Sequence, residues 1–261
     1  MRRLQQFAYP VTAALLALGL WYGLAAGLGV PGYLLPQPHE VARAFGDEFL
    51  TLLRGLTTTG AAALAGLALS ATLGLGMALP LGASRVLRQA LYPHVLLLQI
   101  VPVVILTPLL VLWLGPGFPS VTAVTFLITF FPVVSNTTQG LLATPQVLLD
   151  LFRTRKASKT QEMFLLRLPY SLPHYFDGLR IAATLAPVGA IAGEFFAGSG
   201  SGGRGGLGYL VIVYFSRHET AALFATGFTA CLLGFLFVGA VSIAARLSLR
   251  HWYESYRADS Q

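Results

Sequence analysis

Residues Leu148–Arg180 read LLDLFRTRKASKTQEMFLLRLPYSLPHYFDGLR, and this stretch holds six of the chain's 17 Lys and Arg residues. Across the 261 residues, 55% are hydrophobic and 10% are charged, whereas a soluble domain carries about 25% charged residues. This composition predicts an all-α integral membrane protein. The basic stretch is too polar to cross a bilayer, so we expect it to connect membrane helices on one side of the membrane.

Uncharged runs of about 20 residues predict the membrane-spanning helices, because a helix needs that length to cross the hydrocarbon core. Six spans are predicted, at Phe7–Leu28, Gly55–Ser84, Leu91–Trp113, Val121–Gln139, Ile181–Gly193 and Thr220–Ala245. The third and fourth are separated at LGPGFPS, Leu114–Ser120, because clustered Gly and Pro favour a turn. The fifth is short and contains Pro187, and it is included because the orientation of its neighbours requires it.

The distribution of basic residues orients these six spans, since cytoplasmic loops accumulate Lys and Arg. With both termini in the cytoplasm, the cytoplasmic side carries 13 basic residues, and the outer side carries only Arg43, Arg54, Arg204 and Arg217. The basic stretch Leu148–Arg180 is then cytoplasmic. Topology accounts for the net charge of +7, so the charge does not indicate a nucleic-acid partner.

Three segments are predicted along the chain. They are residues 1–54, a first span plus an outer interfacial helix; 55–246, a five-span core that includes the loop 140–178; and 247–261, a cytoplasmic tail. The interfacial helix is placed at His39–Arg54, and Gly208–Ser216 is too short to cross and predicts a half-helix. The alternative for the N-terminus is a signal peptide, but its apolar run has full span length.

Polar groups inside predicted spans are candidates for a solute pathway, because burying them in lipid is costly. Gln99, Ser135 and Asn136 are such groups, although each also fits a simple hydrogen bond to a neighbouring helix. Glu194 lies near the outer end of the fifth span and requires water or a basic partner, so it either gates the pathway or anchors the fold. No phosphate-binding loop, metal-ligand spacing or catalytic set is found, so neither a cofactor nor enzymatic activity is predicted.

The cytoplasmic loop alternates apolar and basic residues, a pattern typical of a short amphipathic helix that docks on another protein. The alternative is a loop that folds back onto its own helix ends and anionic lipid. The loop resembles that of ATP-binding cassette importer permeases, whose pattern is E-A-A-x-x-x-G followed by I-x-L-P. Asp150, Leu151 and Phe152 stand at E-A-A, Lys156 stands at the glycine, and Leu166–Pro169 stand at I-x-L-P.

Other blocks resemble the nitrate, sulfonate and taurine branch of these permeases, particularly members that import thiamine precursors or riboflavin. These blocks are LLPQPHEV, PLLVLWLG, FFPVVSNTTQGL, LPYSLPHYFDGLRIA, GAIAGEFF and GLGYLV. The chain departs from the family pattern at Lys156, so any turn that uses the glycine must be made differently here.

The resemblance implies a type I importer permease in the bacterial inner membrane, which forms the pathway for a small polar solute. Its partners would be ATPase subunits that bind ATP, an extracytoplasmic substrate-binding protein, a second permease copy and membrane lipid. The residues implied in coupling to the ATPase are Asp150, Leu151, Phe152, Arg153, Lys156, Ala157 and Ser158. A self-contained secondary transporter and a membrane scaffold are the alternatives, and the internal repeats that a carrier often shows are not evident.

Overall fold

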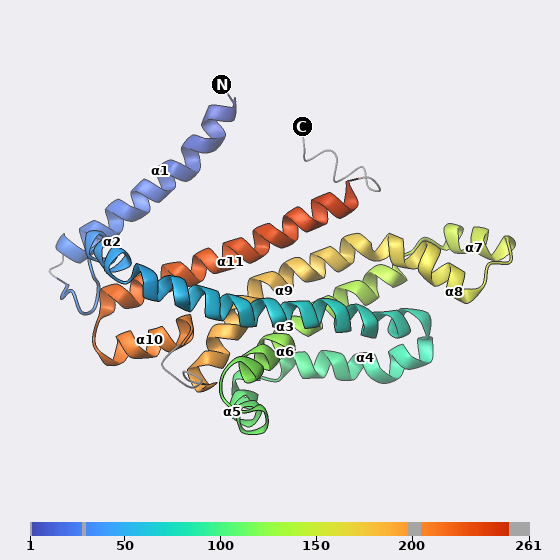
Figure 1. The fold of residues 1–261 in the computed structure, drawn as a ribbon. Helices are drawn as coiled ribbons and strands as arrows, with labels where there is room; N and C mark the ends of the chain where they lie inside the picture. The colour runs from blue at the N-terminus through green and yellow to red at the C-terminus, as the bar shows by residue number, and fades with distance from the viewer. Residues whose placement is uncertain (1, 28–29, 198–204, 251–261) are drawn as a thin grey trace.

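The computed structural model describes residues 2–27, 30–197 and 205–250, most of which are helical (Figure 1). The helices are α1 (Arg2–Tyr22), η1 (Gly23–Gly27), α2 (Pro38–Asp47), α3 (Phe49–Ala83), α4 (Arg85–Ile100), α5 (Val103–Leu114), α6 (Phe118–Leu142), α7 (Gln146–Thr154), α8 (Lys159–Glu162), η2 (Met163–Arg167), α9 (Leu168–Ala197), α10 (Leu207–Ser216) and α11 (Thr220–Leu249). Four stretches are long and apolar enough to cross a membrane: α3, α6, α11 and Lys159–Ala197, which contains α9. The prediction of an all-helical membrane protein is confirmed.

α6 packs between α3 and α9 and forms the centre of the bundle. Glycines permit the close approach of these helices. A Cβ atom on Gly66 of α3 would lie 2.6 Å from the Thr125 side chain, and one on Gly178 of α9 would lie 2.9 Å from the Pro132 carbonyl oxygen. Small residues at the contact let helix backbones approach closely. In a membrane, this close van der Waals packing holds helices together where the hydrophobic effect cannot.

The two ends of the bundle carry different elements (Figure 1). α2 and α10 lie at one end, where α1 and α9 end and α3 and α11 begin. α7 and α8 lie at the other end, where α3 and α6 end. α1 leaves most of its described side chains exposed and contacts α11 through Trp21, whose ring stacks on Phe224 and Phe228 at centroid distances of 5.8 and 6.0 Å.

The predicted third span is divided in two. Its residues form two helices, α4 and α5, which are interrupted at Val101 and Pro102. Pro102 has no N–H to donate and disfavours helical geometry at Val101, so the helix ends here rather than bending. Pro93 and Pro108 lie inside α4 and α5 without ending them.

Three predicted boundaries are corrected. The fifth span is longer than predicted, because α9 continues through Pro173 and Pro187, and the loop 140–178 narrows to 143–167. The interfacial helix does not reach Arg54, since α2 ends at Asp47 and α3 begins at Phe49. The predicted half-helix is confirmed as α10. Of the predicted tail, residues 251–261 lie outside the described residues.

Candidate functional site

α7 lies in the connection between α6 and α9, at the end of the bundle opposite α10 (Figure 1). Its sequence QVLLDLFRT places Leu149 on the inner face, where it is buried. Val147 and Leu151 lie one turn apart on the outer face and are 79% and 55% exposed. Large apolar side chains that share an exposed helix face indicate a contact surface for another protein.

The turn that ends α7 is a Schellman motif centred on Lys156, whose backbone is left-handed with φ +57°. The Lys156 N–H donates to the Arg153 carbonyl at 2.9 Å, and the Ala157 N–H donates to the Phe152 carbonyl at 3.0 Å. Ser158 then caps the start of α8. Lys156 thus adopts the conformation that glycine takes most easily, at the position where the family pattern has glycine.

The ion pairs of this loop use only part of its positive charge. Arg153 Nη1 lies 3.4 Å from Asp150 Oδ1, and Arg167 Nε donates to Glu162 Oε1 at 2.8 Å. Glu162 also lies 3.8 Å from Arg153 Nε. In the described part of the chain, three further basic side chains of the loop have no acidic partner: Arg155, Lys156 and Lys159. The loop therefore presents excess positive charge beside its exposed apolar residues.

The predicted pathway residues do not converge on one site. Ser135 of α6 lies 3.0 Å from the Tyr92 hydroxyl of α4, and the Asn136 side-chain amide donates to the Pro132 carbonyl of its own helix at 2.8 Å. Gln99 is exposed on α4. Ser135 and Asn136 lie in the half of α6 that leads to α7, whereas the fourth candidate, Glu194, lies at the end of α9 that leads to α10.

Glu194 caps the start of α10 and is only 4% exposed. The Gly208 N–H donates to Glu194 Oε2 at 2.7 Å. The Thr59 hydroxyl donates to Glu194 Oε1 at 2.8 Å and accepts the Leu207 N–H at 2.8 Å. The first N–H groups of a helix have no partner within it, and the helix dipole favours a negative group there. Glu194 and Thr59 therefore join α9 and α3 to the start of α10.

A basic partner for Glu194 is not found among the described residues. Arg217 lies at the far end of α10 and makes no ion pair with Glu194, and Arg204 lies outside the described residues. The Gly208 N–H and the Thr59 hydroxyl donate to the carboxylate instead, where water or a basic partner was expected. The far end of α10 is also held, because the Tyr214 hydroxyl donates to Glu48 Oε2 at 2.9 Å.

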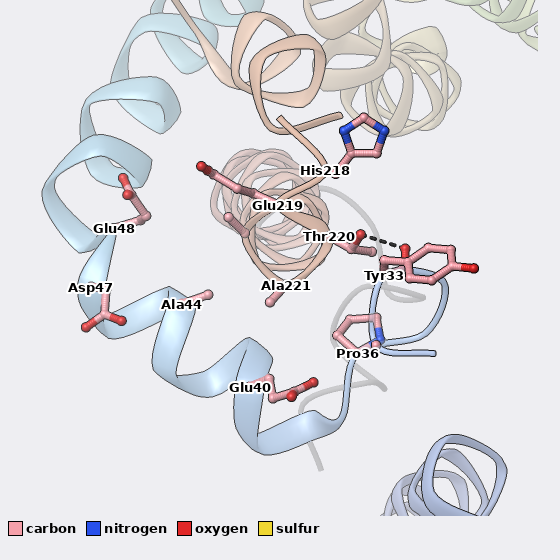
Figure 2. Close-up of a pocket in the computed structure, with 12 residues that line it drawn as sticks. Tyr33, Pro36, Glu40, Ala44, Asp47, Glu48, His218, Glu219, Thr220 and Ala221 are labelled. Carbon is pink, nitrogen blue, oxygen red and sulfur yellow. Dashed lines mark hydrogen bonds between the residues drawn. The ribbon is translucent and has the colours of Figure 1, made fainter. Parts of the chain in front are cut away.

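A cavity of about 460 Å³ opens beside Glu48, between α2 and the turn from α10 to α11 (Figure 2). Four carboxylate residues line it: Glu40, Asp47, Glu48 and Glu219. The Thr220 hydroxyl donates to the Tyr33 carbonyl at 2.8 Å on one side of it. The cavity is therefore acidic, whereas the loop that contains α7 carries excess positive charge. Among the described residues, no group of three or more His, Cys, Asp and Glu residues is placed to hold a metal ion.

Several partners in these contacts were not predicted. Thr59 stands 135 positions from Glu194 and carries no local signal, and Tyr92 is likewise distant from Ser135. An ion pair on α9 was not predicted either, in which Arg180 Nη1 lies 3.5 Å from Asp177 Oδ1. Both residues stand in the predicted block LPYSLPHYFDGLRIA, but the predicted span began after them, at residue 181.

Known proteins match this chain over most of its length. Residues 70–251 match the family described as "Binding-protein-dependent transport system inner membrane component". The chain belongs to this family. The permease is 36% identical over 242 residues to the formylaminopyrimidine transport permease protein of Halalkalibacterium halodurans, an alignment that covers 92% of this chain and 94% of that protein.

Two further relatives align over most of their length. A probable ABC transporter permease protein of Haemophilus influenzae is 35% identical over 216 residues, covering 83% of this chain and 86% of that protein. The riboflavin transport system permease protein of Chloroflexus aurantiacus is 32% identical over 256 residues, covering 96% of this chain and 94% of that protein. The resemblance predicted from the sequence blocks is confirmed.

The chain is thus the permease subunit of an ABC importer for a small solute and a multi-pass protein of the inner membrane. Its family is a transport permease family and not a catalytic one. Membership implies that it works with an ATPase and with a substrate-binding protein. The alternatives of a secondary transporter and a scaffold are set aside.

Proposed function

We propose that α7 is the helix through which this permease couples to its ATPase. The observation that carries the proposal is an amphipathic helix that exposes Val147 and Leu151 and is closed by a left-handed turn at Lys156. The turn stands where the family pattern has glycine, so the geometry of the motif is kept although its residue has changed. Asp150, Phe152, Arg153, Ala157 and Ser158 complete this contact.

The position of α7 gives the coupling a mechanical route. α7 follows α6 after three residues and leads through α8 and η2 directly into α9. α6 and α9 are packed closely at Gly178. Movement of α7 with the closing ATPases therefore moves α6 and α9 together. Closure of the ATPases opens the pathway outward, and their release opens it inward.

We propose six membrane crossings with both termini in the cytoplasm. α1, α3, α6, α9 and α11 each provide one crossing, and α4 with α5 forms a broken third crossing. The arrangement is supported by the excess positive charge of the loop between α6 and α9, since cytoplasmic loops accumulate Lys and Arg. It is also supported by the directions of α1 and α11, because the start of α1 and the end of α11 both point away from α2 and α10 (Figure 1).

We propose that a second copy of the permease completes the solute pathway. Asp177 and Arg180 lie on α9 and are partly exposed, and a charged pair on a membrane helix is expected to face water or another protein subunit rather than lipid. Ser135 and Asn136 lie on the neighbouring α6. These four residues are the polar lining that we assign to the pathway, whereas Gln99 is an outlying candidate and Glu194 is an anchor.

We propose that the solute is a nitrogen heteroaromatic compound of the vitamin or vitamin-precursor type. Two relatives above 30% identity are named for such solutes, formylaminopyrimidine and riboflavin, and both align over more than 90% of the chain. Binding of pyrimidines, flavins, sulfonates and nitrate to the partner substrate-binding protein tests this assignment. A protein that binds only sulfonates or nitrate would contradict it.

The coupling proposal is tested with Val147→Asp, which places a charge on the exposed face of α7. Asp is favourable in the first turn of a helix, so α7 itself is expected to keep its structure. We expect the variant to lose the ATPase during purification in detergent. Thr160→Asp is the matched control, because it adds the same charge to an exposed position in the first turn of α8.

Retention of the ATPase by Val147→Asp, at the level of Thr160→Asp, would remove α7 from the docking surface. Thermal unfolding of both variants in detergent serves to separate docking from folding. We expect the two variants to unfold at the same temperature as the wild-type permease.

A further inference from the structure

A hollow of about 370 Å³ lies in the loop between α6 and α9, next to the turn at Lys156. Six residues line it: Leu151, Phe152, Arg155, Ala157, Gln161 and Leu165. They come from the end of α7, the turn, α8 and η2. The α7 residues proposed for coupling thus do not form a simple convex ridge, since Leu151 and Phe152 are two walls of a hollow.

The lining is mostly apolar and is open. Leu151 and Leu165 are 55% and 66% exposed, on segments that are separated by the turn. Ala157 is the smallest lining residue, and the Schellman turn brings its N–H to the Phe152 carbonyl. Apolar side chains that face a concave surface of this size are covered when one side chain of a partner inserts.

The charges around the hollow specify the partner further. Arg155 lines it, and Lys156 and Lys159 lie next to it in the chain. None of the three has an acidic partner among residues 2–27, 30–197 and 205–250. The acids of the loop are already engaged, Asp150 with Arg153 and Glu162 with Arg167. A partner that covers the hollow therefore has to supply carboxylates from outside this chain.

We propose that the hollow is a socket for one apolar side chain of the ATPase, flanked on the ATPase surface by Asp or Glu residues that face Arg155 and Lys159. The proposal rests on the proposed function of α7 and adds a second half to that contact. The exposed face with Val147 enters the ATPase, and the ATPase enters the loop at Leu151 and Leu165. Because each subunit inserts a side chain into the other, the contact transmits movement of the ATPase away from the permease as well as movement toward it.

Ala157→Phe tests the socket, because the added ring fills the hollow without adding charge. We expect the dissociation constant for the purified ATPase to rise about tenfold or more, with normal thermal unfolding of the permease. Thr154→Phe is the matched control, since Thr154 is exposed nearby and does not line the hollow. If Ala157→Phe folds poorly, a second pair of variants outside the turn repeats the measurement of ATPase affinity. Leu165→Trp fills the hollow, and Phe164→Trp is its control because Phe164 does not line the hollow.

Arg155→Glu tests the charge complementarity. We expect weaker ATPase binding by this variant at low salt and a smaller loss of its affinity as salt rises, because attraction between exposed charges is screened by salt.

Failure of the socket is distinguishable from failure of the coupling proposal. Unchanged ATPase affinity in both Ala157→Phe and Leu165→Trp, with Val147→Asp still defective, would overturn the socket alone. Unchanged affinity in all three variants would overturn the docking of this loop altogether. If Ala157→Phe instead separates the permease into single copies and keeps the ATPase affinity, the occupant is a second permease and the proposal is wrong.

Discussion

Lys156 occupies a left-handed backbone conformation that costs a side-chain-bearing residue about 1–2 kcal/mol relative to glycine. Replacement by valine, which is branched at Cβ, adds further strain in this region of backbone space. We expect Lys156→Val to weaken ATPase binding and to speed proteolysis of the loop, and Lys156→Gly to bind the ATPase at least as well as the wild-type permease. Pull-down and limited proteolysis measure both.

Lys159→Val is the control for these variants, because it removes the same charge from the first turn of α8 without placing a branched residue in a left-handed turn. Equal proteolysis of the loop in Lys156→Val and Lys159→Val would show that the turn geometry is unimportant. Equally weakened ATPase binding by Lys156→Gly and Lys156→Val would show that the lysine charge, and not the backbone, is what the ATPase requires.

Glu194 is the second residue with a strong expected effect. Glu194→Leu leaves the Gly208 N–H without an acceptor and the Thr59 hydroxyl without its carboxylate partner. A buried hydrogen-bonding group left unsatisfied costs about 1–3 kcal/mol, so we expect a clearly lower unfolding temperature in detergent. Glu194→Gln keeps one acceptor oxygen and is expected to fall between Glu194→Leu and the wild type.

Glu219→Gln is the comparison for Glu194, since this carboxylate lines the open cavity of Figure 2 and makes none of the buried hydrogen bonds of Glu194. We expect its unfolding temperature to match the wild type. If Glu194→Leu also matches the wild type in stability but abolishes uptake, Glu194 is a gate rather than an anchor.

At the scale of helices, the packing of α3 on α6 sets the rigidity of the core. A Cβ on Gly66 would lie 2.9 Å from the Phe126 backbone nitrogen, whereas a Cβ on Gly76 of the same helix meets no atom within 4 Å. We expect Gly66→Ala to destabilise the permease by about 1–3 kcal/mol, because overpacking shifts the backbone. Gly76→Ala is expected to be neutral or stabilising, because alanine favours helix.

Thermal unfolding in the same detergent compares the two alanine variants. If Gly66→Ala is as stable as the wild type, α3 and α6 can move apart to accommodate the methyl group with no loss of stability. The close contact at Gly66 would then not contribute to the rigidity of the bundle.

The helices differ in how well their sequences predict them. α3, α6 and α11 follow from uncharged runs of span length, and α10 follows from an apolar run that is too short to cross. The sequence does not show that the helix ends at Pro102, because Pro93 and Pro108 lie in the same region without ending their helices. The early start of α9 was not predicted, because the charged residues Asp177 and Arg180 indicate a loop rather than a membrane-spanning helix.

Across the whole molecule, the basic loop between α6 and α9 was predictable from the sequence, and the buried cap of α10 was not. The loop combines local charge, apolar spacing and a motif register in one continuous stretch, so its residues carry their own signal. The cap joins Thr59, Glu194 and Gly208 from three helices, and only folding brings them together. The proposed pathway residues Asp177 and Arg180 emerged in the same way, from the helix that α9 forms.

Uptake into proteoliposomes tests whether this permease transports only when an ATPase drives it through α7. We expect uptake of solute from its loaded binding protein only when ATP and the ATPase are present with wild-type permease, and none with Val147→Asp. Saturable uptake by the permease alone, or ATP-driven uptake by Val147→Asp at the wild-type rate, would contradict it.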